Sequence, residues 1–428
     1  MNYLLNITYL YFIQIAATSK KKLLIFIVVV FFYGDLFGQN NIAGDTAKYH
    51  PKDTAAMHQV KQIDIWDVAR YLFGLKFGSR PDTEKIAPGK LMFSMVPAIG
   101  YTLEAGFEAS LTANLSFYTA DPNTTYMSTI ATIAQYSIHN QLVTPIMSRI
   151  WLKNNTIKLV GDWRFFSYPS KTFGLGDTTS LNKVDNVNYY YVQIHEVGYY
   201  HFHSHYYLGL GYYYDNHWDI RDYTDPSETD YLQYDDNLTA TRSSGPVASI
   251  CYDNRANANN PQGGFYGSLL YRYNLTSLGS ISDWQYFEAE FRKYFKLRPN
   301  LILALWNRDL LTWGGYVPYF DLPANGFGTE HFTGRGYIQS RFRGADQFYG
   351  ESELRFGITR NGLLGGVVFA NTETVPNWPS NTYTAMFPAG GVGLRIKFNK
   401  FSDVNICIDY AVGVGGSHGF FFNLGEVF

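Results

Sequence analysis

A row of histidines is one of two patterns in this chain that could carry chemistry. His201, His203 and His205 alternate with other residues, so in a β-strand their imidazoles would share one face with Tyr199 and Tyr207. Imidazoles two residues apart could hold a divalent cation. No nearby carboxylate or cysteine completes a ligand set, and spacing along a strand rarely closes a tetrahedron. We therefore expect these histidines to form a polar lining, and we expect no metal ligand.

The second pattern is the segment Gly415–Gly419, which matches the Gly-x-Ser-x-Gly motif of serine hydrolases at Ser417. That motif places its serine where a strand turns into a helix, whereas here a hairpin leads into the last strand. The sequence also has no Walker loop, no His-Glu-x-x-His motif and no dinucleotide fingerprint. It therefore gives no support for an enzyme, and no cofactor is expected.

The composition indicates which elements position these residues. Aromatic residues make up 18% of the chain, with 36 tyrosines and 32 phenylalanines, and no stretch after residue 40 could span a bilayer as a helix. Tyrosine suits the rims of a membrane barrel, where the ring meets acyl chains and the hydroxyl meets water. A tyrosine-rich soluble sandwich is the alternative. The net charge of -2 gives no indication of a nucleic-acid partner.

The last nine residues alternate as a strand of an outer-membrane barrel does. The apolar residues on one face, towards lipid, are Phe420, Phe422, Leu424 and Phe428. Asn423 and Gly425 would lie on the other face, towards the lumen. Bacterial outer-membrane barrels end in this way, although a soluble edge strand could show the same pattern. The residues expected to form a C-terminal assembly signal are Phe420, Phe422, Leu424, Gly425 and Phe428.

Alternation continues from about Lys90 to Phe428 in short segments between turn residues. In one of the clearest, the apolar row Val392, Leu394, Ile396 and Phe398 opposes the row Gly391, Gly393, Arg395 and Lys397. Charges that point into a lumen explain this pattern. At roughly 20 residues per strand and connection, the length fits a number of strands in the mid-teens. We therefore predict an all-β transmembrane antiparallel barrel over residues 90–428, as one domain.

Residues 1–38 are typical of a secretory signal peptide. Lys20–Lys22 precede an apolar run from Leu23 to Tyr33 that is too short for a membrane span, and Gly34–Gln39 supply a small, polar exit. An exported protein could pair its cysteines, Cys251 and Cys407. We expect them to stay free, because Cys407 lies on the polar face of its segment, where a small lumen residue is the simplest interpretation.

A short amphipathic helix is predicted at residues 64–74, within a short periplasmic segment of residues 39–89. Asp64 can cap this helix and Gly74 can end it. Its apolar stripe consists of Ile65, Val68, Ala69, Leu72 and Phe73. The stripe must be buried in the barrel mouth, against the inner leaflet or on a partner, unless the helix simply packs on its own barrel.

One loop carries a resemblance to a known family. Gly334-Arg335-Gly336-Tyr337 resembles the lid-loop signature Val-Arg-Gly-Phe/Tyr of the BamA/TamA superfamily of outer-membrane assembly and secretion barrels, also called the bacterial surface antigen family. Other segments follow the order of the family: Phe173–Asp177, Tyr252–Arg255 with Pro261 and Gly264, Glu353–Arg355, Gly365–Asn371, Gly391–Phe398, Asp409–Ala411 and Phe420–Phe428. The resemblance implies about 16 strands, a lid loop folded into the lumen and a weak seam between the first and last strands.

The resemblance also implies partners for Arg335. In the family the loop arginine pairs with the aspartate of a Phe-x-Asp strand, but this chain has Asn371 there. A neutral amide can hydrogen-bond but cannot form the ion pair that a buried arginine needs. Glu353, Glu373 and Asp409 are the acidic residues that we expect to serve instead. The alternative is that Arg335 lies in a solvated external loop.

The implied function is insertion or translocation of proteins at the outer membrane of a Gram-negative bacterium. The seam between a first strand near Lys90–Tyr101 and a last strand near Gly419–Phe428 would open for this purpose. Most members of the family carry POTRA domains before the barrel, and residues 39–89 are too few to form one, so the chain resembles the subset without them. Expected partners are outer-membrane lipids, client outer-membrane proteins and partner subunits. The alternative is a structural or accessory barrel of an outer-membrane complex, and a passive channel is a weaker one.

Overall fold

The computed structural model describes residues 62–73, 88–103, 105–177, 179–182, 184–223, 234, 238–326, 333–400 and 403–428. The predicted signal peptide, Gly74 and most of the segment of residues 39–89 lie outside these ranges. Among the described residues, no helix is both long and apolar enough to cross a membrane.

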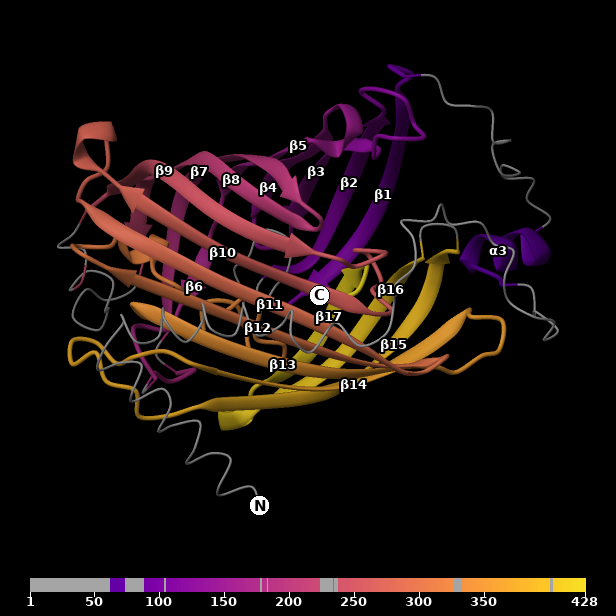
Figure 1. Cartoon of the computed structure of the whole chain (residues 1–428). Coiled ribbons are helices and arrows are strands. Elements are labelled where there is room, and N and C mark those ends of the chain that lie inside the picture. Colours follow the sequence, from indigo (N-terminus) through magenta and orange to yellow (C-terminus); the bar gives the residue numbers. More distant parts are fainter. Residues whose placement is uncertain are drawn as a thin grey trace. The chain divides into compact units, whose positions relative to one another are not determined.

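The described chain forms one antiparallel sheet of 17 strands and a short helix (Figure 1). The strands of the first half are β1 Met92–Thr102, β2 Gly106–Phe117, β3 Ser128–Ser137, β4 Leu142–Trp151, β5 Ile157–Ser167, β6 Ser170–Thr172, β7 Asp185–His203, β8 Tyr206–Asp222 and β9 Ala240–Asp253. Those of the second half are β10 Gly264–Asn274, β11 Trp284–Arg298, β12 Leu301–Trp313, β13 Asp346–Gly357, β14 Leu364–Thr374, β15 Phe387–Asn399, β16 Val404–Gly413 and β17 His418–Leu424. The helix is α3, Ile65–Phe73.

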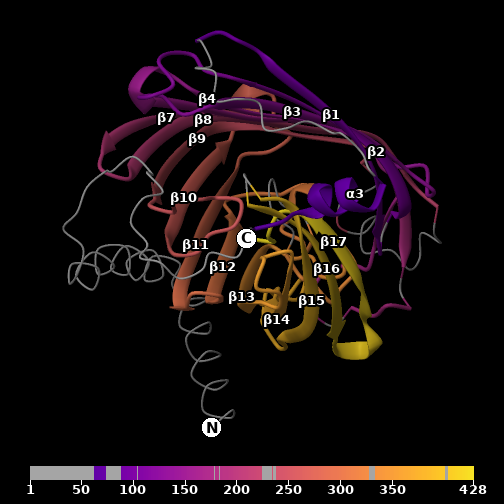
Figure 2. The same cartoon turned by 90° about the vertical axis from the view of Figure 1, so that its right-hand side faces the viewer.

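Apart from β5 and β6, each strand pairs with the next along the chain, from β1 with β2 to β16 with β17. Because the short β6 and the longer β5 both pair with β7, the 17 strands occupy 16 positions. Viewed from its right-hand side in Figure 2, the sheet curls round so that both of its ends lie on the same side. The predicted all-β antiparallel architecture of about 16 strands is confirmed.

Connections alternate between two ends of the sheet because neighbouring strands run in opposite directions. We call one end the loop end, which carries the β6–β7, β12–β13, β14–β15 and β16–β17 connections. The other is the turn end, which carries the β9–β10, β13–β14 and β15–β16 connections and the chain terminus after β17. Helix α3 contacts the turn end, where the Ile63 N–H donates to the Asn361 carbonyl oxygen over 3.1 Å.

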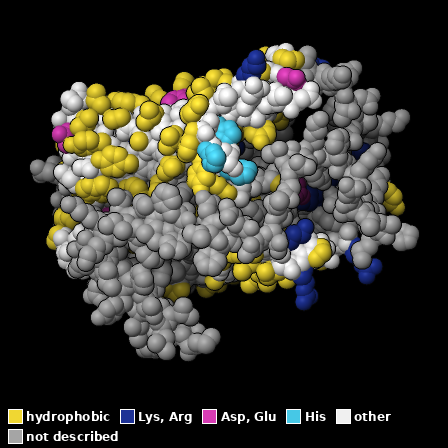
Figure 3. Space-filling model, viewed as in Figure 1, with side chains coloured by type: hydrophobic (Ala, Val, Ile, Leu, Met, Phe, Trp, Pro, Cys, Tyr) yellow, Lys and Arg dark blue, Asp and Glu magenta, His cyan; other side chains and the backbone are white. Residues whose placement is uncertain are grey.

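The strands present an apolar outer face and a polar inner face. On β16, Tyr410 and Val412 are exposed, whereas Asn405, Cys407 and Asp409 are buried. Figure 3 shows hydrophobic side chains spread over the outer face of the strands. Large continuous apolar surfaces are uncommon on soluble proteins and suit contact with acyl chains.

The chain terminus departs from the predicted alternation. Phe420, Phe422 and Leu424 are exposed on the outer face as expected, but Phe428 is 1% exposed and lies inside, packed on Trp306 with ring centres 5.1 Å apart. The expectation that Phe428 shares the outer face is therefore wrong. The physical reason is Gly425, whose φ of 98° is a left-handed conformation that turns the chain out of the strand and into the barrel.

Truncating Phe428 should therefore weaken the barrel. Phe428→Ala removes a ring from a packed internal cluster and is expected to lower the free energy of unfolding by about 3–5 kcal/mol. The midpoint temperature of the heat-dependent gel shift of the folded barrel would measure this loss. Phe422→Ala, on the outer face, is the matched control. A smaller shift for Phe428→Ala than for Phe422→Ala would contradict the inward position of the terminus.

Candidate functional site

The loop between β12 and β13 is folded against the inner wall of the sheet. Its described second half includes the buried residues Thr333, Arg335, Tyr337, Ser340, Phe342 and Arg343. Gly334 and Gly336 have φ values of 78° and 112°, which favour glycine. At Gly336 a Cβ would also lie 2.7 Å from the Cβ of Ala389 on β15. The two glycines therefore let the backbone around the arginine run directly against the wall.

Arg335 is 3% exposed and pairs with three carboxylates. Its Nη1 donates to Asp409 Oδ2 over 2.5 Å, and its Nη2 donates to Glu351 and Glu353. The guanidinium carbon lies 3.6 Å from the centre of the Phe369 ring. Burial by itself lowers the pKa of the Arg335 guanidinium, but the charges of the carboxylates raise it well above its ordinary value. The arginine therefore remains a cation inside the barrel.

The structure places three of the four expected partners in contact with Arg335. Glu353 and Asp409 bind the guanidinium directly. Asn371 binds the backbone, because its Nδ2 donates to the Arg335 carbonyl oxygen over 2.9 Å. The asparagine thus holds the loop without an ion pair, and the charge of the arginine is balanced by residues on β13 and β16.

Glu373 and Glu351 differ from the expectation. Glu373 accepts a hydrogen bond from Gln347 Nε2 over 3.0 Å, and no ion pair joins it to Arg335 within the described part of the chain. Glu351 was not among the expected partners, yet it binds the guanidinium. It lies two residues before Glu353 on β13, and this spacing places both on one face of a strand. That spacing is the signal that could have identified it.

Arg355 and Arg395 extend this buried network to the end of the chain. Together they hold Glu426 and the backbone of Phe428, which follow β17. The hydrogen bonds are Arg395 Nη1 to Asp409 Oδ1 (2.5 Å), Arg395 Nε to Glu426 Oε2 (2.8 Å), Arg355 Nε to Glu353 Oε2 (2.7 Å) and Arg355 Nη2 to the Phe428 carbonyl oxygen (2.9 Å). The β12–β13 loop, which we call the inward loop, and the chain terminus are therefore bound by the same charged residues.

The first and last strands, β1 and β17, contact each other with no residue-by-residue register between them in the described structure. A Cβ placed on Gly419 would meet the side chain of Leu103, which follows β1, so the two residues face each other at the loop end. β17 has 7 residues, whereas β1 has 11. The last strand is therefore too short to cover the whole edge of the first.

Loops from separate parts of the chain meet at the loop end. Asp177, after β6, accepts hydrogen bonds from the backbone N–H groups of Thr384 and Ala385, each over 2.7 Å. The Gly176 N–H donates to the carbonyl oxygen of Arg343 over 2.8 Å. These bonds tie the β6–β7 loop both to the β14–β15 loop and to the inward loop.

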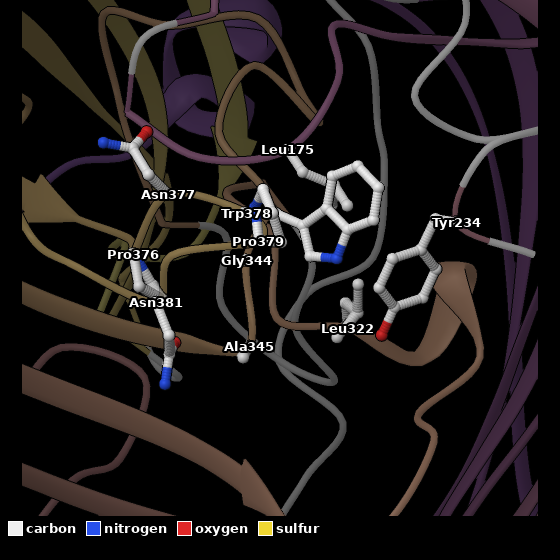
Figure 4. Close-up of a pocket in the computed structure, with 10 residues that line it drawn as sticks. All are labelled: Leu175, Tyr234, Leu322, Gly344, Ala345, Pro376, Asn377, Trp378, Pro379 and Asn381. Atoms are coloured by element: carbon white, nitrogen blue, oxygen red, sulfur yellow. The ribbon is translucent and has the colours of Figure 1, made fainter.

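A pocket of about 130 Å³ lies among these loops, and Figure 4 shows the Trp378 indole and the Tyr234 ring on one side of it. The centres of these rings are 5.8 Å apart. Other lining residues are Leu175, Leu322, Pro376 and Pro379. The pocket is smaller than the roughly 300–1,000 Å³ of typical ligand sites, so we assign no ligand to it.

The histidines do not share one strand face. β7 ends at His203 and β8 begins at Tyr206, so His205 lies in the turn between them. The expectation of a single strand is therefore wrong, because a two-residue hairpin turn follows His203 and a register shift separates His201 from His203. No group of three or more possible metal ligands occurs among the described residues.

Ser417 lies in the hairpin between β16 and β17, followed by strand rather than helix. Its position lacks the strand-to-helix turn that the hydrolase motif requires. Cys251 and Cys407 are both buried and free, as predicted. The Cys407 Sγ lies 3.1 Å from the Gly425 carbonyl oxygen, at the point where the chain turns inward.

These features define a class of protein: a large, curled antiparallel sheet with an apolar outer face and one loop bound to its inner wall by buried charges. No protein-family model matches the sequence, and a comparison with curated proteins finds no similar sequence. Solved structures do match. BamA from Haemophilus ducreyi lacking POTRA domains 1–3 is 14% identical, with a TM-score of 0.50 over 78% of this chain and 69% of that chain.

CdiB from Acinetobacter baumannii is 12% identical, with a TM-score of 0.50 over 78% of this chain and 60% of that chain. At this identity the likeness concerns the fold. The chain therefore shares the fold of these two barrels, as the lid-loop resemblance led us to expect.

Proposed function

We propose that this chain acts in the outer membrane, where it inserts or translocates proteins through the seam between β1 and β17. The observation that carries the proposal is the mismatch in strand length at the seam, 11 residues against 7. It leaves part of the β1 edge without a strand partner on that side among the described residues. An unpaired strand edge can template an incoming strand, so a client segment could add to β1.

The buried network supplies a way to control the seam. Arg335 belongs to the inward loop and Glu426 to the terminus, and both are held through Asp409 and Arg395. Displacing the loop would remove a cation from the carboxylates that position the terminus. Releasing the terminus would in turn free the end of β17, so loop position and seam geometry are coupled in this proposal.

The second candidate is an accessory barrel that anchors partner subunits and moves no substrate. Asn371 favours it, because this residue replaces the aspartate of the family pattern and leaves a neutral contact to the loop. The bonded loops at the loop end favour it as well, since they tie the β6–β7 loop to the β14–β15 loop. Under this candidate, the seam would stay shut during the life of the protein.

Controlled depletion of the protein in its host tests the proposal. The chain is expected to fractionate with the outer membrane and to shift on gels with heating, and its depletion is expected to lower the abundance of a set of other outer-membrane proteins. Mass spectrometry of isolated outer membranes measures this. Recovery of the chain in the soluble periplasm would contradict the location, and an unchanged set of outer-membrane proteins would favour the accessory barrel.

A further inference from the structure

Helix α3 is attached to the turn end through one side. Asp67 forms an ion pair with Lys400, and the Lys400 N–H donates to Asp64 Oδ2 over 3.3 Å. The Trp66 ring meets the Phe398 ring of β15 edge to face, with centres 5.7 Å apart. Burial raises the pKa of the Asp67 carboxyl, but the hydrogen bond and charge of Lys400 outweigh this effect and lower it. The attachment therefore combines a charged contact with an aromatic one.

Part of the apolar stripe of α3 points away from this attachment. Trp66 and Asp67 mark the side of the helix that contacts the barrel. Since successive residues of a helix are about 100° apart, Ile65, Val68 and Leu72 lie on the opposite side. Leu72 is 64% exposed, and the neighbouring Tyr71 is 89% exposed. Ile65, Val68 and Ala69 are half-buried, so the exposed part of the predicted stripe lies at Leu72.

The outer face of the barrel continues directly into the helix. Phe398 lies at the turn end of the outward row of β15, in which Val392 is 58% and Leu394 is 38% exposed. Because Trp66 packs on Phe398, α3 begins where the lipid-facing surface ends. Figure 1 shows the helix beside the turn end of β15 and β16. Tryptophan and tyrosine are enriched where a membrane meets water.

We propose that α3 lies in the membrane interface at the turn end and anchors the barrel to that leaflet, with Val68, Tyr71 and Leu72 in contact with lipid. The proposal rests on the outer-membrane location and is independent of any role of the seam. The binding surface is the boundary between head groups and acyl chains, which an amphipathic helix enters to a depth of about 5–10 Å. The ion pair between Asp67 and Lys400 would set the rotation of the helix about its axis.

Fluorescence quenching in vesicles tests this placement. The full chain carrying Leu72→Cys would be refolded into vesicles of phosphatidylethanolamine and phosphatidylglycerol and then labelled, in its folded state, with an environment-sensitive dye. The buried Cys251 and Cys407 are expected to remain unlabelled. Asn154→Cys, in the exposed β4–β5 turn at the same end, is the control position. Folding of both variants is verified by the heat-dependent gel shift.

Quenchers attached high on the acyl chain are expected to reduce the signal at position 72 and to spare position 154, whereas aqueous iodide should do the reverse. Quenching of position 72 by iodide alone would overturn the proposal, as would protection from both quenchers, which would mean that protein covers the stripe. Val68→Cys provides a second position on the same stripe and should behave like Leu72→Cys. A negative result here leaves the depletion test of protein insertion untouched.

Discussion

Replacement of Arg335 by alanine is expected to lower the free energy of unfolding of the barrel by about 3–5 kcal/mol, because removing one partner of a buried ion pair leaves the other uncompensated. Here three carboxylates lose a common cation, namely Glu351, Glu353 and Asp409. Two of them keep an arginine, since Arg355 pairs with Glu353 and Arg395 with Asp409. Glu351 keeps only its neutral partner Tyr349 among the hydrogen bonds of the described chain.

Because only Glu351 loses its cation, a second substitution at Glu351 should restore part of the stability. Arg335→Ala combined with Glu351→Gln should recover part of the lost stability, because the second change removes the carboxylate that is left without a cation. Arg341→Ala is the matched control: Arg341 belongs to the same loop but bonds to Thr179 rather than to the network. The midpoint of the heat-dependent gel shift measures each variant. Equal losses in the free energy of unfolding for Arg335→Ala and Arg341→Ala would contradict a stabilising role of the charged network.

A separate measurement tests whether Arg335 also fixes the position of the β12–β13 loop. With Arg335 removed, the inward loop should leave the wall, and a cysteine introduced at the buried Ser340 should become reactive to a water-soluble maleimide. The same cysteine in the otherwise unchanged chain should stay unreactive. If Ser340→Cys is equally protected in both backgrounds, the loop is held by its other contacts, such as the hydrogen bond from the Tyr337 hydroxyl to the Pro388 carbonyl oxygen over 2.7 Å.

The sequence is sufficient to predict the strands that form the wall of the barrel, but it is not sufficient to predict the residue at which each strand ends. Alternation with period two fixes which side chains face inward, and it correctly gave an antiparallel sheet with a number of strands in the mid-teens. The family resemblance supplied the closer figure of about 16 strands. Alternation does not say where a strand stops. The inward turn at Gly425 and the hairpin turn after His203 are both strand ends, set by local backbone conformation, and the pattern was extended past each of them.

The charged site shows a similar limit. A glycine-flanked arginine and nearby acidic residues were recognisable from the chain, because a buried arginine requires an anion. Which anions it meets depends on the register between β13, β14 and β16, which pairs Glu351 with Asn371 and leaves Glu373 beside Gln347. Register follows from the whole sheet, so one sequence without its pairing partners could offer the candidates but could not choose Glu351 over Glu373.

A covalent lock across the seam is expected to have the largest effect on activity. Leu103, in the turn directly after β1, faces Gly419 of β17, so Leu103→Cys with Gly419→Cys offers a pair that can form a disulfide if the Cα atoms lie within about 7 Å. Gly419 is not among the glycines with positive φ, so a side chain is tolerated by the backbone there. If clients enter through the seam, oxidation should stop their assembly and reduction should restore it.

The control for this lock is a disulfide in a ladder that never needs to open. Tyr410 on β16 and Phe420 on β17 are direct partners on the outer face, so Tyr410→Cys with Phe420→Cys ties β17 to its permanent neighbour. Assembly of outer-membrane proteins should be unaffected by this second bond. Mobility on non-reducing gels shows the extent of each cross-link, and quantitative proteomics of the outer membrane gives the activity. Undiminished assembly by a fully oxidised Leu103/Gly419 pair would mean that the seam stays closed in function, and the accessory barrel would then be the better description of this protein.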